Sequence, residues 1–298
     1  STNTRPDYTL MNGRVRLFFL DAKKRTVNIK DDNSVAFQIR SYGWSIGASY
    51  SVVTNMDELA IYDCTAMPRH TDNADFARVV YMKTENYMDN FDRLNSFLGR
   101  EETISNSHRV RFVGKDSIDK NFSKALSSVR LNLAQAIING NHYKISIADI
   151  NLWTQIILNR ILFIRVCEAR GLERDGLLKD FAATDFWTEF KRSSYIDFYE
   201  HYDGPMFARI RHIQDLIIDN AVFDDLLSYL YYPSPYCFDV IPLKSISDIY
   251  DLFLGYHLEY DDSGILENVL KSEFRKSNGA VLSLIHISEP TRLRCISY

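Results

Sequence analysis

RPDYTLMNGRVRLFFLDAKK, residues 5–24, decides the fold of the first half of this chain. Asn12-Gly13 is a strong signal for a tight β-hairpin turn. The stretch 15–20 that follows is an almost continuous apolar run, which is typical of a buried strand. The sequence therefore predicts a hairpin whose second strand leads directly into Asp21-Ala22-Lys23.

Two carboxylates and one lysine are expected at the open end of this hairpin. Asp7 opens the first strand, and the return of the chain brings Asp21 near it. Side chains alternate between the faces of a strand, so Asp21 and Lys23 point the same way. A pair of carboxylates suits Mg²⁺, which takes oxygen ligands, keeps several waters and completes its shell from substrate phosphate. Lys23 is then placed to orient an attacking water or to stabilise charge developing on phosphorus.

A helix is expected after the hairpin, with Ser34 as its N-cap and its end near Trp44. Gln38 and Tyr42 are four residues apart, which places both on the helix face that could turn to the site. The competing interpretation is that Asp21-Ala22-Lys23 is a strand end with ordinary surface charges. A second triplet of this kind, at 189–191, lies in helical sequence with no acid-bearing hairpin before it, and we interpret it as a solvated helix face.

The rest of the chain divides into a β-rich region and a helical region. Up to about residue 115 it is β-rich, with short strands predicted at 51–54 and 59–62 and a helix predicted over 74–99. From about residue 117 to 257 it is almost wholly helical, and a last helix is predicted over 246–256.

The clearest helix of the helical region begins at Ser146. Asp149 follows three residues later as a capping-box partner, and Gly171 supplies a C-terminal stop. The charged residues on this helix are interpreted as a structural ion-pair network rather than as DNA contacts, although phosphate contact is left open; they are Arg160, Arg165, Glu168 and Arg170. The tyrosine-rich stretch 229–236 is interpreted as packing around a proline-rich turn.

Charge is distributed unevenly along the sequence. Residues 1–44 hold eight Lys and Arg against four Asp, so the remainder carries −8 in a chain whose net charge is −4. A local basic surface can attract a polyanion even in a mildly acidic protein, although such an imbalance is more often a solvated face. Within this segment, Lys24, Arg25 and Arg40 are the candidates for contact with DNA.

Composition excludes several classes of protein. With 46% hydrophobic and 25% charged residues, the chain is globular rather than disordered. Its four cysteines lie far apart and form no C-x-x-C pair, which argues against a disulfide scaffold or a structural zinc site and for a reducing compartment. The sequence shows neither a signal peptide nor 18 uninterrupted apolar residues, so we expect a cytoplasmic protein without a membrane segment.

The C-terminal stretch has an unusual sequence. Residues 282–292 read LSLIHISEPTR, which looks like the translation of a sequencing-library adapter. We therefore expect 282–298 to be a non-native tail, and we give His286 and Cys295 no functional role. The chain is expected to be an internal fragment of a longer protein.

These motifs together resemble a known family of nucleases. Pro6-Asp7, Asp21-Ala22-Lys23 and the Gln38/Tyr42 pair are similar to the PD-(D/E)xK nuclease superfamily. Their fuller context resembles the nuclease part of bifunctional type II restriction–modification enzymes, in which one chain carries a nuclease, a helical connector and an adenine-N6 methyltransferase. The helical sequences at 158–173 and 230–255 resemble that connector.

The resemblance implies a particular domain organisation. Residues 1–115 would be an α/β PD-(D/E)xK nuclease domain truncated at its N-terminus, and 116–260 an all-α helical connector. Residues 261–281 would begin the link to a methyltransferase domain that is missing here. S-adenosylmethionine is expected only for that missing domain, because the chain has neither a glycine-rich cofactor loop nor an N-P-P-Y motif.

For the site, the resemblance implies metal binding by Asp7 and Asp21, catalysis by Lys23 and accessory roles for Gln38 and Tyr42. The implied function is Mg²⁺-dependent hydrolysis of phosphodiester bonds in double-stranded DNA. Two features depart from the family pattern: the second acid is Asp rather than the usual Glu, and Arg25 stands where such enzymes often have proline. Two alternatives stay open. The parent protein could be best described as a DNA adenine methyltransferase, or the domain could be a degenerate nuclease that only binds DNA.

Overall fold

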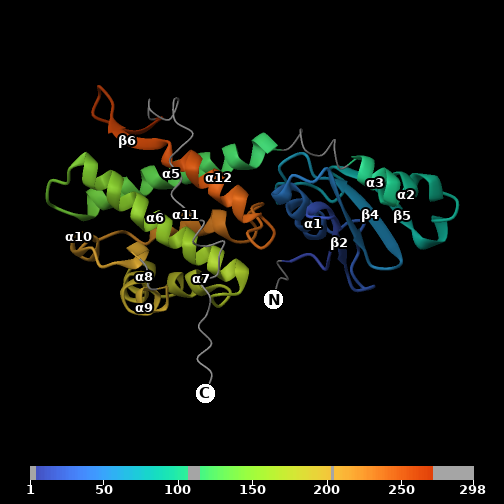
Figure 1. Cartoon of the computed structure of the whole chain (residues 1–298), viewed down its shortest axis with the longest axis horizontal. Coiled ribbons are helices and arrows are strands. Elements are labelled where there is room, and N and C mark those ends of the chain that lie inside the picture. Colours follow the sequence, from blue (N-terminus) through green and yellow to red (C-terminus); the bar gives the residue numbers. More distant parts are fainter. Residues whose placement is uncertain (1–4, 107–114, 203–204, 271–298) are drawn as a thin grey trace, which may run out of the picture. The chain divides into compact units, whose positions relative to one another are not determined.

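The computed structural model describes residues 5–106, 115–202 and 205–270 (Figure 1). The expected adapter-derived tail and the preceding residues 271–281 lie outside these ranges. The chain clusters into two compact units. Within the described residues, the sheet unit comprises 5–106, 115–118, Ile164–Leu177 and Asp224–Ile241, and the helical unit comprises Asp119–Phe163, 178–202, 205–223 and 242–270.

A five-stranded mixed sheet forms the centre of the sheet unit, in the order β1-β2-β3-β4-β5. Its strands are β1 (Tyr8–Asn12), β2 (Val15–Ala22), β3 (Tyr50–Thr54), β4 (Glu58–Asp63) and β5 (Arg78–Lys83). Strands β2 and β3 are parallel and are connected through helix α1 (Asn33–Ile46), whereas the other neighbours are antiparallel. The predicted strands at 51–54 and 59–62 are confirmed, each slightly longer than expected.

The predicted hairpin is confirmed, with a turn one residue further along the chain than its sequence signal. Asn12 remains in β1 and pairs with Val15, so the two turn residues are Gly13 and Arg14. Gly13 has a φ of +58°, which a residue without a Cβ adopts at little cost. The pairing register slips between Leu10 and Met11, which produces a β-bulge in the hairpin.

Helix α1 begins differently from the prediction. Its N-cap is Asp32, whose carboxylate accepts hydrogen bonds from the backbone N–H groups of Ser34 and Val35. Ser34 is not the cap, because its hydroxyl donates to Asp32 instead. An ionised carboxylate is a better hydrogen-bond acceptor than a hydroxyl at the positive end of a helix. The helix ends at Gly47, which is in the left-handed conformation.

The helix predicted over 74–99 is wrong for most of its length. Residues 78–83 form β5, and after the short 3-10 turn η1 (Thr84–Asn86) only α2 (Phe91–Leu98) is α-helical there, followed by α3 (Arg100–Asn106). The run Val79-Val80-Tyr81 is β-branched and aromatic, and it pairs with the edge of β4. Val80 and Met82 are thereby buried on one face, so tertiary pairing overrides the apparent helical spacing of the aromatic residues.

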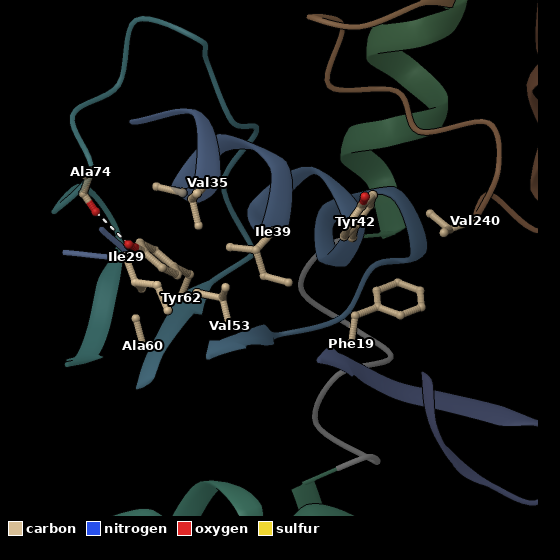
Figure 2. Close-up of a cluster of buried hydrophobic side chains, with 11 residues drawn as sticks. Phe19, Ile29, Val35, Ile39, Tyr42, Val53, Ala60, Tyr62, Ala74 and Val240 are labelled. Atoms are coloured by element: carbon tan, nitrogen blue, oxygen red, sulfur yellow. Dashed lines mark hydrogen bonds between the residues drawn. The ribbon is translucent and has the colours of Figure 1, made fainter. Parts of the chain in front are cut away.

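Two hydrophobic clusters cover the two faces of the sheet. Figure 2 shows the cluster on the α1 face, where Val35, Ile39 and Tyr42 of α1 pack toward Phe19 and Val53 of the strands. The cluster on the opposite face includes residues of β2 to β5 and is packed by side chains of α2. In Figure 1, α1 accordingly lies on one side of the strands and α2 on the other. Helix α1 therefore holds its polar side chains against the C-terminal end of β2.

Helices dominate the rest of the chain. They are α5 (Lys115–Gly140), α6 (Ile147–Arg170), α7 (Leu177–Ala182), α8 (Phe186–Tyr195), α9 (Asp197–Tyr202), η2 (Pro205–Phe207), α10 (Arg211–Gln214), α11 (Ala221–Leu230) and α12 (Leu243–Leu254). The capping box of α6 is confirmed, since the Ser146 hydroxyl accepts from the Asp149 N–H at 3.1 Å and donates to its carboxylate. Gly171 ends the helix with a φ of +72°, as predicted.

The end of the described chain differs from the all-helical prediction. Helix α12 starts at Leu243 and stops at Leu254, and an antiparallel hairpin of β6 (Tyr256–Tyr260) and β7 (Leu266–Leu270) follows it. The side chain of Asn151 fixes β6 to α6, because its amide donates to Leu258 O and its carbonyl accepts from Leu258 N. This long-range pairing has no signal in the local sequence.

Among the described residues, α6 is the one helix long and apolar enough to cross a membrane. Half of its most apolar window is buried within the protein, and a buried core helix meets the same criterion, so the feature is weak evidence for a membrane span. Three charged side chains of this helix are buried and bonded inside the protein, as a core helix requires; they are Arg160, Arg165 and Glu168.

Candidate active site

The end of β2 positions the central carboxylate of the site. Asp21 pairs with Val53 of the parallel neighbour β3, and the Lys23 N–H donates to Thr54 O at 2.7 Å. The pairing extends the sheet just past the acidic residue and fixes the backbone of the whole triplet. Asp21 is only 2% exposed, whereas Ala22 points to solvent.

Asp7 approaches this carboxylate from the start of β1. Its own carboxylate accepts from the Ala22 N–H at 2.8 Å, and its N–H donates to Asp21 Oδ1 at 3.4 Å. These reciprocal bonds tie the first strand of the hairpin to the last residues of the second. The structure thus brings Asp7 and Asp21 together.

Lys23 connects the carboxylates to helix α1. Its ammonium lies 2.6 Å from Asp21 Oδ2 and also donates to Gln38 Oε1 at 2.6 Å. The amide of Gln38 in turn donates to the Tyr42 hydroxyl at 2.9 Å, across one turn of the helix. All five residues predicted for the site are therefore joined by hydrogen bonds or an ion pair, in the order Asp7, Asp21, Lys23, Gln38 and Tyr42.

Burial determines the electrostatics of the site. It raises the pKa of the Asp21 carboxyl, and the negative charge of Asp7 adds to this, while the hydrogen bond and positive charge of Lys23 lower it. Burial also raises the pKa of Tyr42, so its hydroxyl stays protonated. The site therefore holds a carboxylate whose negative charge is only partly compensated by the protein.

The donor set fits a hard divalent cation. Carboxylate oxygens are preferred ligands of Mg²⁺, and a cation between Asp7 and Asp21 would compensate the buried charge. In the part of the chain that the structure describes, no group of three or more His, Cys, Asp or Glu could enclose a metal ion. A cation here would thus take its remaining ligands from water, backbone or substrate oxygen atoms, which is the ordinary situation for Mg²⁺.

The three residues predicted to contact DNA differ in their exposure to solvent. Lys24 and Arg25 are exposed, and the guanidinium of Arg25 forms a bidentate pair with Asp57. The prediction for Arg40 is wrong, because this side chain is fully buried. Its guanidinium pairs with Asp72 at 2.7 Å and lies 4.8 Å from the ring centre of Phe76. The segment after β4 folds over α1 and encloses this arginine.

The ion-pair network predicted on α6 is only partly present. Arg165 pairs with Glu168 at 3.5 Å, and the Tyr231 hydroxyl donates to the same carboxylate. Arg160 instead donates to backbone carbonyls, those of Met206 and Ala208. Arg170 likewise donates to main-chain carbonyls, at 239 and 241. A guanidinium group has several N–H donors, so it can satisfy backbone carbonyl oxygens of irregular loops that have no partner in a helix or strand.

The 189–191 triplet is on helix α8, as predicted, but only its first residue behaves as a solvated face. Glu189 pairs with Arg192 at the surface. Phe190 is 2% exposed, and the Lys191 ammonium donates to Gln214 O and Leu216 O while burial lowers its pKa. In the described stretch 115–202, no acid-bearing hairpin precedes this triplet.

Sequence reasoning missed the contribution of the loop after α11. Residues of this loop line a depression together with Gln38 and Tyr42; they include Tyr232, Tyr236 and Asp239. The predicted packing role of the tyrosine-rich stretch agrees with the burial of Tyr231 and Tyr236. The prolines were the available signal, since they mark an irregular segment, but they do not indicate what it contacts.

Comparison with known proteins gives one informative similarity. The Escherichia coli protein "Type II restriction enzyme and methyltransferase RM.Eco57I" is 30% identical to this chain over 278 residues. The aligned region covers 90% of this chain and 28% of that protein, so the chain spans little more than a quarter of its relative. No family model matches the chain, and no solved structure does. Nearly the whole chain is therefore similar to part of a restriction–modification enzyme.

Proposed function

We propose that the sheet unit is a Mg²⁺-dependent nuclease of the PD-(D/E)xK kind that hydrolyses phosphodiester bonds of double-stranded DNA within a restriction–modification enzyme. The observation that carries this proposal is the buried Asp21 beside Asp7, with Lys23 held between Asp21 and Gln38. The similarity to a protein named as a restriction enzyme and methyltransferase supports the same interpretation.

Each side chain of the site has a distinct task in this proposal. Asp7 and Asp21 would hold the cation, which supplies Lewis acidity and an ordered water for in-line attack on phosphorus. The Lys23 ammonium orients that water and stabilises the charge that develops on the phosphate oxygens. Gln38 keeps the lysine directed to the carboxylates, and the Tyr42 hydroxyl fixes the rotamer of Gln38.

Plasmid nicking by the purified chain in Mg²⁺ tests the proposal. We expect Asp21→Ala and Lys23→Ala each to lower the nicking rate by at least about 10²-fold, the usual effect of removing one charge-stabilising group. Lys244→Ala is a matched control, because Lys244 is an exposed lysine whose partner is the nearby Asp248. Nicking by Lys23→Ala at the unmodified rate would rule out the assigned role of the lysine.

DNA binding is measured on the same preparations with Ca²⁺ in place of Mg²⁺. A chain that binds duplex DNA without nicking it under any divalent cation would be a binding domain, and the nuclease proposal would then be wrong. In a complete parent enzyme, Lys23→Ala should leave adenine methylation from S-adenosylmethionine intact, because the lysine acts on the attacking water. Loss of methylation together with cleavage would instead indicate a scaffolding role for this unit.

A further inference from the structure

Three arginines from separate parts of the sheet unit converge on the chain at 239–241. Arg5 precedes β1 and donates to Ala169 O at 2.8 Å. Arg16 of β2 donates to Val240 O. Arg170, the last residue of α6, donates to Asp239 O at 3.2 Å and to Ile241 O at 2.7 Å. We call Arg5, Arg16 and Arg170 the arginine cluster.

The positive charge of the arginine cluster exceeds the negative charge of the carboxylates around it. Arg5 pairs with the Asp239 carboxylate at 3.3 Å, and Arg165 also approaches this carboxylate, at 3.9 Å. In the described ranges, neither Arg16 nor Arg170 has a carboxylate within ion-pair distance. Burial lowers the pKa of Arg170, and the positive charges of Arg16 and Arg5 lower it further, whereas the negative charge of Asp239 raises it. Such a group is electrostatically suited to an anion.

The β-bulge places this charge on the same side of the sheet as the candidate site. Because Leu10 pairs with Phe18 and Met11 with Arg16, Leu17 is an extra residue on β2. The bulge leaves Arg16 on the face of Asp21, where it contacts the backbone of a residue packed in the α1-face cluster. At about 3.3 Å per residue, Arg16 lies roughly 16 Å along β2 from Asp21.

A DNA backbone matches this spacing. Successive phosphates of one strand advance by about 3.4 Å along the duplex axis, so roughly 16 Å corresponds to about five base steps. The cluster is also continuous with the site at its other end, because Arg5 lies two residues before Asp7. Arginine is suited to this task, since its planar guanidinium can bond phosphate oxygens while other N–H groups hold the backbone.

We propose that Arg5, Arg16 and Arg170 form a phosphate-binding cluster that holds the backbone of duplex DNA, with Arg5 beside the bond at Asp21 and Arg16 about five base steps from it. This inference rests on the proposed nuclease function, for which it supplies a positioning surface. A contact of this kind fixes the register of the duplex and reads no base sequence. The alternative is that the three arginines only clamp the loop at 239–241.

Salt-dependent binding of a duplex, in Ca²⁺ and without cleavage, distinguishes these two roles. Each phosphate contact contributes about 0.9 to the slope of log affinity against log salt concentration. We therefore expect the triple variant Arg5→Gln/Arg16→Gln/Arg170→Gln to lower the magnitude of that slope by about 2–3. At about 0.1 M salt its affinity should fall by at least about 100-fold. Arg93→Gln is the matched control, because Arg93 is exposed and also donates to a backbone carbonyl, that of Val79.

Charge-conserving variants separate electrostatics from folding. The double variant Arg5→Lys/Arg16→Lys should keep most of the salt slope, because the positive charge remains while the bidentate geometry is lost. If the triple variant does not fold, Arg5→Gln is measured alone, since this side chain is 57% exposed; its slope should fall by about 0.9. An unchanged slope in a folded variant would overturn the phosphate-binding role.

The result is also separable from the nuclease proposal. Wild-type chain that binds duplex DNA with a steep salt slope but never nicks it would refute the nuclease function and leave the arginine cluster as a DNA-binding surface. Wild-type chain whose binding does not change with salt would overturn the cluster, whatever its nicking activity.

Discussion

Replacing Asp21 with Asn should stabilise the fold while it destroys the candidate site. The Asp21 carboxylate is buried, and its raised pKa means that the fold disfavours the charged form even with Lys23 beside it. Asn keeps the size of the side chain and removes the charge, while the Lys23 ammonium keeps its hydrogen bond to Gln38 Oε1 and its access to solvent, since its side chain is 20% exposed. We expect the free energy of unfolding at pH 7 to rise by about 0.5–2 kcal/mol, the usual gain when a strained functional group is relieved.

Removing the lysine instead should have the opposite effect. In Lys23→Met the buried carboxylate of Asp21 loses the ammonium that lies 2.6 Å away. Loss of one partner from a buried pair costs about 3–5 kcal/mol, and we expect about 3 kcal/mol because the Lys23 side chain is 20% exposed. The double variant Asp21→Asn/Lys23→Met should recover most of this loss, because no buried charge then lacks its partner.

The pH dependence gives a second measurement of the same effect. The pKa of Asp21 is higher in the folded state than in the unfolded state, where it is 3.8. Ionisation of Asp21 therefore lowers the stability of the fold as the pH rises from 3.8 through the folded-state pKa. The gain from Asp21→Asn should therefore be absent below pH 3.8 and complete above the folded pKa. Urea unfolding between pH 3.5 and 7 measures it. An Asn variant that is less stable at pH 7, by an amount independent of pH, would refute the reasoning.

Three further changes test the packing of the molecule. Gly43→Ala should destabilise the fold by about 1–3 kcal/mol, because an added Cβ would lie 2.8 Å from Cys64 Cβ; thermal unfolding measures this, and an unchanged midpoint would show that the contact can relax. Arg40→Leu should lower stability by about 3 kcal/mol through loss of the Asp72 pair and leave the salt slope of DNA binding unchanged; a smaller slope would restore Arg40 as a DNA contact. Ser146→Ala should cost about 1 kcal/mol in urea unfolding as a lost helix cap, and a neutral result would mean that water replaces it.

Local sequence was sufficient to predict the hairpin and the residues of the candidate site. The apolar run of β2 ends directly at Asp21, and strand alternation relates Asp21 to Lys23 without knowledge of the rest of the fold. The four-residue spacing of Gln38 and Tyr42 similarly follows from helix geometry. These relations are short-range, so the structure reproduces them as hydrogen bonds and an ion pair.

Contacts between segments that are distant in the sequence determine which charges are buried and which strand pairs are formed. Arg40 has the same charge as Lys24, yet the segment carrying Asp72 and Phe76 encloses it, and that segment lies far along the sequence. Strand β5 exists because β4 presents an edge to which it can pair. The arginine cluster exists because the loop at 239–241 offers carbonyl oxygens to Arg16 and Arg170 and the Asp239 carboxylate to Arg5. Burial and long-range pairing depend on the neighbours that folding provides, whereas alternation and helical spacing depend on the chain alone.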